Sequence, residues 1–240
     1  MKLKLSCIQC HFHNIDEIEN YNIILELRDD NLYTFKCENG HESTIYFGAH
    51  KFELLFEMGV YSYLDGYYRE AITNFAAAIE RFHEFSIELF TSIFYQNDND
   101  YSDVWKQVSN QSERQLGAYT LLYYVVFKKP PIPQDRKWVE FRNNIIHKGK
   151  FPTQEETFNF ANATFKYIKE KLVELKMNHG DRFKDFDDTE KLRLKHKVAH
   201  NFTLWRDALT FKSVQSIDEL DSLDLLKSIA EKEKFRPFTR

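Results

Sequence analysis

Short runs of apolar residues, several of them β-branched or aromatic, mark the first 48 residues of the chain. The clearest runs are residues 21–28 and 32–37, and the polar cluster Asp29–Asp30–Asn31 between them is typical of a turn. We therefore expect a β-hairpin over these two runs. A further short strand is expected at residues 43–47.

After about fifty residues the apolar spacing changes to three or four, which is the period of an amphipathic helix. Gly66, the prolines of 130–133 and Gly149 mark helix ends. Thr153 and Glu156 fit a capping box that opens another helix. The pattern predicts a mainly α fold, a helical bundle preceded by a small β-hairpin module. The expected helices span about 52–63, 67–94, 103–127, 134–148 and 153–177, and the last sixty residues are also expected to be helical.

The composition is that of a folded protein. Hydrophobic residues make up 42% of the 240 positions and charged residues 29%, with only 7 Gly and 5 Pro, which excludes disordered and collagen-like classes. The 22 Phe and 13 Tyr supply large contact areas that suit the packing of helices. The length allows a small module followed by a larger domain, and we expect the boundary between residues 48 and 49.

The chain carries no signal for a membrane or for secretion. It has no apolar run of about 18 residues, and its first residues turn polar too early for a signal peptide. Three Cys is an odd number for a disulfide framework, whereas a reducing compartment favours thiolates as metal ligands. We therefore expect a cytoplasmic protein. The formal net charge of −4 argues against nonspecific coating of nucleic acid, so positive charge must be sought locally.

Two pairs of metal-ligand residues flank the predicted hairpin. Cys7 and Cys10 form the first pair, and Cys37 and His41 form the second, with Gly40 allowing a tight turn beneath an ion. Four nitrogen or sulfur ligands complete a zinc tetrahedron and leave no position for water, so the spacing predicts a structural Zn²⁺ in a zinc ribbon at residues 1–48. A module this small has a limited core, and such an ion supplies the stability that the core lacks.

Other interpretations of these residues stay open at the level of sequence. The three cysteines could be unrelated reduced thiols, and Cys7 and Cys10 could be a redox pair, although no βαβ pattern surrounds them. The fourth ligand is less certain than the metal, because His11, His13 and His50 are further candidates. A catalytic zinc would need an open coordination position and a nearby general base, and this pattern suggests neither.

The segment 141–149 concentrates polar residues on one expected helix. Asn143 and His147 are four apart and share a face, and Arg142 lies beside them. Arginine makes forked contacts to phosphate, and histidine titrates near neutral pH, so the set suits phosphodiester chemistry. Seven Lys or Arg stand against two Asp or Glu between Lys128 and Lys150, a local positive excess that favours RNA as the ligand.

The pattern Arg142-Asn143-x-x-x-His147 resembles the R-N-x-x-x-H motif of HEPN-domain ribonucleases. Residues 67–82 are similar to the long helix that precedes the motif helix in this family, and the resemblance covers about residues 50–175. It implies a HEPN-like helical bundle, with a C-terminal helical extension, over residues 49–240. It also implies a homodimer in which two motif helices form one cleft that cuts RNA without a metal, and many members are toxins or antiphage defence effectors.

Carried over by position, the resemblance assigns His147 as general base for the ribose 2′-hydroxyl and Arg142 as the group that steadies the charge on the phosphate. Asn143 would orient both. An acidic residue on the preceding helix would hold Arg142, and the products would end in a 2′,3′-cyclic phosphate. The supporting residues expected on these grounds are Glu80, Glu84 and Lys148.

Two function classes therefore compete. The first is a metal-independent endoribonuclease whose partners are RNA, a second copy of the chain and an antitoxin or regulatory protein. The alternative is a noncatalytic HEPN-like module in which the zinc ribbon and the basic helix bind RNA or protein. The sequence has no Gly-rich phosphate loop and no nucleophile elbow, so nucleotide-dependent and serine hydrolase functions lack support. His83 is interpreted as structural.

Overall fold

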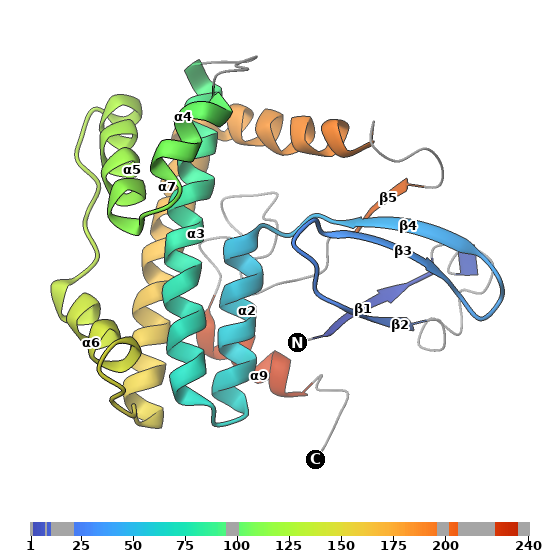
Figure 1. Cartoon of the computed structure of the whole chain (residues 1–240), viewed down its shortest axis with the longest axis horizontal. Helices are drawn as coiled ribbons and strands as arrows, with labels where there is room; N and C mark the ends of the chain where they lie inside the picture. The colour runs from blue at the N-terminus through green and yellow to red at the C-terminus, as the bar shows by residue number, and fades with distance from the viewer. Residues whose placement is uncertain are drawn as a thin grey trace. The chain divides into compact units, whose positions relative to one another are not determined.

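A computed structural model of the chain describes residues 2–7, 9–10, 22–94, 101–195, 202–205 and 224–234. The chain divides into two compact units (Figure 1). The ribbon unit comprises Met1–Ala49 and Asp187–Ala208, and the helical unit comprises His50–Phe186 and Leu209–Arg240. The expected mainly helical class with a small antiparallel β-module is confirmed. The first stretch of the ribbon unit ends at Ala49, one residue from the expected boundary, and this unit also includes a late segment of the chain.

The ribbon unit contains two small sheets. In the first, β1 (Lys2–Ser6) pairs antiparallel with β2 (Asn22–Glu26). In the second, β4 (Glu42–Phe47) is the central strand and pairs antiparallel with β3 (Leu32–Lys36). The late segment supplies β5 (Phe202–Trp205), which pairs parallel with β4. This strand lies where the sequence led us to expect helix, so that part of the expected C-terminal helical extension is wrong.

The hairpin expected between residues 21–28 and 32–37 does not form, and the second of these runs pairs with β4 instead. The strands at 22–26 and 32–36 exist, but they lie in separate sheets, so their expected pairing with each other is wrong. Asn31 explains the difference, because its carbonyl accepts from Phe47 N at 2.9 Å and its side chain donates to Ala49 O at 2.9 Å. These bonds extend the ladder between β3 and β4 past Leu32. The turn before β3 therefore directs the chain toward β4 and away from β2.

The helical unit is built on two helices that pack side by side, α2 and α3 (Figure 1). Contacts join α3 to both α5 and α6, and α9 contacts α2. No helix in the part of the chain that the structure describes is long and apolar enough to cross a bilayer. The helices are α2 (Lys51–Leu64), α3 (Tyr68–Phe94), α4 (Tyr101–Val108), α5 (Ser112–Phe127), α6 (Arg136–Ile146), α7 (Gln154–Lys195) and α9 (Leu225–Lys234).

One expected helix is divided in two, one expected helix end coincides with a break in α7, and one expected cap is present. The single helix expected at 103–127 is two helices, α4 and α5, and the Gln115 side chain of α5 donates to Ser109 O at 2.8 Å, just after the end of α4. The segment α7 is two helices joined at His179, whose backbone is non-helical (φ −141°, ψ 33°), so the first of them ends close to the expected residue 177. At its start, Thr153 and Glu156 exchange the two bonds of a capping box, at 2.9 and 3.2 Å.

The core of the helical unit is rich in aromatic rings. Phe52 meets Phe82 edge-on with ring centroids 5.3 Å apart, and Phe56 lies 4.9 Å from Phe75. Gly59 permits this packing, because a Cβ atom at this position would lie 2.5 Å from a ring carbon of Phe75. Burial of this apolar surface and the close packing of the rings stabilise the helical unit.

Candidate functional site

Three cysteines and one histidine form a cluster that could hold a metal ion. The ligand atoms of Cys7, Cys10, Cys37 and His41 all lie within 4.8 Å of one another, and the three cysteines are buried. Cys10 Sγ lies 3.7 Å from Cys37 Sγ and 3.2 Å from His41 Nδ1. Ligands about 2.3 Å from a tetrahedral zinc ion are separated by roughly 3.7 Å. The spacing of the cluster therefore fits a metal of this size.

The second ligand pair lies in a tight turn that also closes the sheet. Between Cys37 and His41, the Gly40 N–H donates to Cys37 O at 2.9 Å and the Cys37 N–H donates to His41 O at 3.0 Å. Gly40 has φ +81°, which L side chains rarely adopt. Asn39 Nδ2 donates to Cys10 Sγ at 3.4 Å. The turn that places two ligands therefore also joins β3 to β4, so an ion bound there would stabilise the pairing of these strands.

The protein environment separates the thiol pKa values. Burial raises the pKa of Cys7, but hydrogen bonds from the Cys10 backbone and the Ser43 side chain more than offset this and bring it down to about 7. Burial raises the pKa of Cys10 to about 11. A metal binds thiolates, so its binding would release a proton from Cys10 at neutral pH. All three cysteines are free of disulfides.

The alternative histidine ligands were His11, His13 and His50, and of these the structure describes His50. Among the described residues, His41 is the histidine that joins the cysteine cluster. His50 instead lies at the start of α2, where its ring packs 4.5 Å from Phe85. His11 and His13 lie outside the described residues. The structure thus brings together the four ligands that the spacing favoured.

The helix that carries the Arg-Asn-x-x-x-His pattern is α6, close to the expected span. Asp135 caps it by accepting from the Lys137 N–H at 3.0 Å. Ile145 is fully buried, and the rings of Trp138 and Phe141 contact Phe160 of α7, with centroids 5.9 and 5.8 Å apart. These apolar contacts fix the rotation of α6 about its own axis. The polar residues of the motif are therefore held in one orientation.

Arg142 is tied to one of the two acidic residues proposed as its partner. Its Nη1 lies 3.2 Å from Glu80 Oε1 on α3, and both side chains are about one-third exposed. Glu84 instead pairs with Arg81, its neighbour on the same helix. One N–H edge of the guanidinium therefore contacts a carboxylate, and part of the Arg142 side chain stays open to solvent.

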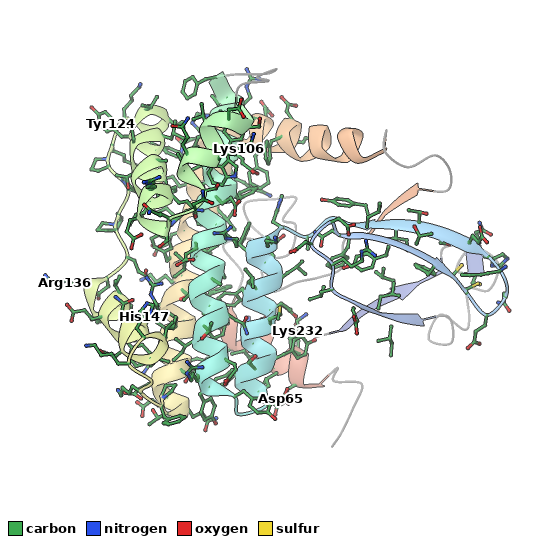
Figure 2. All side chains as sticks on the ribbon, viewed as in Figure 1. Asp65, Lys106, Tyr124, Arg136, His147 and Lys232 are labelled. Carbon is green, nitrogen blue, oxygen red and sulfur yellow. The ribbon has the colours of Figure 1, made fainter. Side chains whose placement is uncertain are left out.

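His147 ends α6 and remains open to solvent. Its backbone keeps a helical conformation (φ −96°, ψ −28°), and its N–H donates to Asn143 O at 3.0 Å, so the two side chains share a face as expected. Figure 2 shows His147 at the end of α6 opposite Arg136. Lys148 is also exposed. The exposed imidazole is therefore accessible to a ligand that approaches from solvent.

The local positive charge is smaller than the sequence indicated. Five of the seven cations between Lys128 and Lys150 lie within 4 Å of a carboxylate, and three of those partners come from α3 and α7. A count of charges within residues 128–150 misses these three partners, because Glu80, Glu156 and Glu174 lie outside that range. The pairs are Lys129–Glu174, Arg136–Glu140, Lys137–Asp135, Arg142–Glu80 and Lys150–Glu156.

His83 belongs to the core, as the sequence interpretation held. Its Nε2 lies 2.9 Å from Tyr167 Oη, and its ring stacks on Tyr119 at 4.5 Å. Burial lowers the pKa of His83 to about 4, so the ring is neutral in the folded protein at pH 7. Nearby, Tyr123 donates to the Glu174 carboxylate, which Lys129 also pairs at 2.6 Å. These polar contacts were not anticipated from sequence, because each joins residues far apart in the chain.

Comparison of the chain with protein-family models, with curated proteins and with solved structures returns no match. The resemblance of residues 142–147 to the HEPN motif therefore rests on those residues and their position in a helical chain. Function must be inferred from the chemistry of the side chains.

Proposed function

We propose that this protein is a HEPN-type endoribonuclease that cleaves RNA without a metal ion and uses α6 as its catalytic element. One observation supports this most. Arg142 of α6 pairs with Glu80, and the same helix α6 ends in the exposed His147. A positioned guanidinium can neutralise phosphate charge, and an imidazole can move protons near pH 7. These are the two tasks that RNA cleavage requires.

The proposed reaction uses the substrate's own ribose as nucleophile. His147 accepts the proton of the 2′-hydroxyl, and the 2′-oxygen forms a bond to phosphorus as the bond to the 5′-oxygen breaks. The leaving 5′-oxygen takes up a proton from water, and His147 then returns its proton to solvent, which leaves a 5′-hydroxyl on one product and a 2′,3′-cyclic phosphate on the other. Arg142 stabilises the negative charge that builds up on the phosphate oxygens. Asn143 orients the phosphate and the imidazole.

We further propose that the cysteine and histidine cluster holds Zn²⁺ in a structural role. The donor set of three sulfurs and one nitrogen suits zinc, and four protein ligands leave no position for a substrate or an attacking water. The ligands are buried or half-buried, as in a site that stabilises a fold. Zinc here would secure the ribbon unit and take no part in cleavage.

We also propose that two copies of the chain associate. Exposed apolar residues on α5, including Leu121 and Tyr124, form a surface that a second copy would cover. Figure 2 shows Tyr124 on α5 and Arg136 on α6, the two helices that follow each other in the chain. Light scattering of the purified protein tests this, and Leu121→Asp should yield the monomer.

Cleavage of a labelled single-stranded RNA in magnesium-free buffer tests the ribonuclease. His147→Ala should reduce the rate by about 10²- to 10⁴-fold, because a general base contributes that much. Arg142→Ala should be similarly damaging. Arg136→Ala is the matched control, since Arg136 lies on the same helix with its side chain 91% exposed and pairs with Glu140.

The products and the substrate provide a second check. Mass spectrometry should find the 2′,3′-cyclic phosphate, and RNA with 2′-O-methyl riboses should stay intact because its nucleophile is blocked. Cutting of the methylated RNA would contradict the mechanism. RNA that is bound but left whole by the parent protein would identify the noncatalytic binding module instead.

A further inference from the structure

One aromatic side chain next to the motif is turned outward. Phe151 is 84% exposed, the highest value for a large apolar side chain among the residues with described burial. It follows His147 by four positions. The neighbouring aromatic residues Trp138 and Phe141 both pack inward on Phe160. Phe151 therefore leaves a ring in water that the fold itself does not use.

The loop that carries Phe151 is held at both ends. Gly149 takes φ +71°, and the Lys150 N–H donates to Asn144 O at 3.1 Å, which ties the loop to α6. Lys150 Nζ pairs with Glu156 Oε1 of α7 at 2.8 Å, and Pro152 is buried. The ring is thus presented from a constrained backbone between two helices. A constrained, exposed ring loses little conformational entropy when a ligand stacks on it.

An unpaired cation lies between the motif and the ring in the sequence. Lys148 is exposed and forms no ion pair with any of the residues described. Lys150, by contrast, is engaged with Glu156. An open lysine and an exposed ring on one short loop are the two elements that bind single-stranded nucleic acid, since one contacts phosphate and the other contacts the face of a base.

We propose that Phe151 is a stacking platform for an unpaired nucleobase and that Lys148 contacts an adjacent phosphate, so that the substrate is single-stranded RNA. This inference rests on the proposed function, because it takes RNA as the ligand of α6. In a duplex each base is already stacked on its neighbours and has no free face to offer. The loop would therefore select unpaired nucleotides close to the bond that is cut.

Binding measured without cleavage tests the platform. Fluorescence anisotropy of the full chain with a labelled 2′-O-methyl single strand gives the affinity, because this RNA cannot be cut by 2′-attack. Phe151→Ala should bind roughly 5- to 150-fold more weakly, the range for loss of one stacked base. Phe151→Trp should retain binding. Phe94→Ala is the matched control, since Phe94 is 51% exposed at the end of α3.

The same assay tests the lysine and the strand preference. Lys148→Met should reduce the slope of log affinity against log salt by about 0.7, as expected for one phosphate contact with a single strand. The parent protein should bind the corresponding duplex more weakly than the single strand, and Phe151→Ala should shrink that difference. Equal affinities of Phe151→Ala and Phe94→Ala would overturn the proposal.

Two other results would also overturn it. If Phe151→Ala lowers the molar mass in light scattering, the ring is buried between copies of the chain and not against a base. If the parent binds no single-stranded RNA, there is no platform.

Failure of the platform can be told from failure of the nuclease. RNA that is bound through Phe151 but never cut keeps the platform and removes the ribonuclease. RNA that is cut while Phe151→Ala binds normally keeps the ribonuclease and removes the platform.

Discussion

The ribbon unit and the helical unit secure their folds in different ways. In the ribbon unit four ligand side chains converge on one point, and a small set of large apolar side chains is buried in the same unit: Leu5, Tyr33, Phe35, Ile45 and Phe47. In the helical unit α2, α3, α5 and α7 enclose a continuous cluster of aromatic and aliphatic side chains. An ion bound at the cluster would concentrate the stability of the ribbon unit in one site, whereas the helical unit spreads its stability over many contacts. Perturbations should therefore act on one unit at a time.

Loss of a metal ligand should have the largest effect. Cys10→Ser should abolish metal binding and unfold β3, β4 and β5, because structural zinc contributes about 10–16 kcal/mol in zinc-finger peptides. Metal analysis by mass spectrometry and amide exchange of the strands provide the measurement. Protection of α2 and α3 should persist. Full metal content in Cys10→Ser would show that the cluster is not the site.

Truncation of a core ring should come next and spare the metal. Phe82 is fully buried and contacts Phe52, so Phe82→Ala should lower the free energy of unfolding by about 3–5 kcal/mol. Urea unfolding followed by circular dichroism measures this, and the metal content should equal that of the parent protein. Phe94→Ala, at a half-exposed position, should change stability by less than about 0.5 kcal/mol. Equal losses in the two variants would contradict the packing described.

Acid should weaken the helical unit through His83. Its pKa is lowered by burial to about 4, whereas the unfolded chain has an ordinary value near 6.5. The unfolded state therefore binds more protons between these values, so this contribution to stability is complete above pH 6.5 and is lost as pH falls toward 4. The loss should approach roughly 3 kcal/mol.

Unfolding free energies at pH 7, 6, 5 and 4 test this, and the slope should shrink in His83→Gln. An unchanged slope in that variant would show that other groups cause the acid sensitivity.

The smallest effect on stability should come from the pair that matters most for the proposed chemistry. Glu80 and Arg142 are both partly exposed, so Glu80→Gln should cost less than about 1 kcal/mol of folding free energy. We nevertheless expect kcat for RNA cleavage to fall by up to about 100-fold, because the guanidinium loses its position. Glu84→Gln is the matched control, since Glu84 pairs with Arg81. Comparable kcat values for the two variants would remove Glu80 from the site.

Local signals in the sequence located most elements but not their partners. The helical period and the prolines after Lys129 placed α6, and ligand spacing identified the cluster of Cys7, Cys10, Cys37 and His41. The choice between Glu80 and Glu84 depends on how α3 is rotated against α6, which the sequence alone does not specify. Likewise, the exposure of Phe151 follows from the loop around it and not from its residue type.

Strand pairing was the least predictable feature, because it is nonlocal. The strands at 22–26 and 32–36 were recognised, but their pairing depends on the turn at Asn31 and on the metal-ligand turn at 37–41. β5 is only four residues long and lies in a segment of mixed polarity, so its sequence carries little pattern. Its position is determined by a backbone ladder to β4, which any residue except proline can join.

The pairing of β4 with β5 sets an order of events during synthesis. The residues of β4 leave the ribosome roughly 150 residues before those of β5, which corresponds to a delay of about 8–30 s at typical elongation rates. During that interval the nascent ribbon unit has one edge of its central strand unpaired.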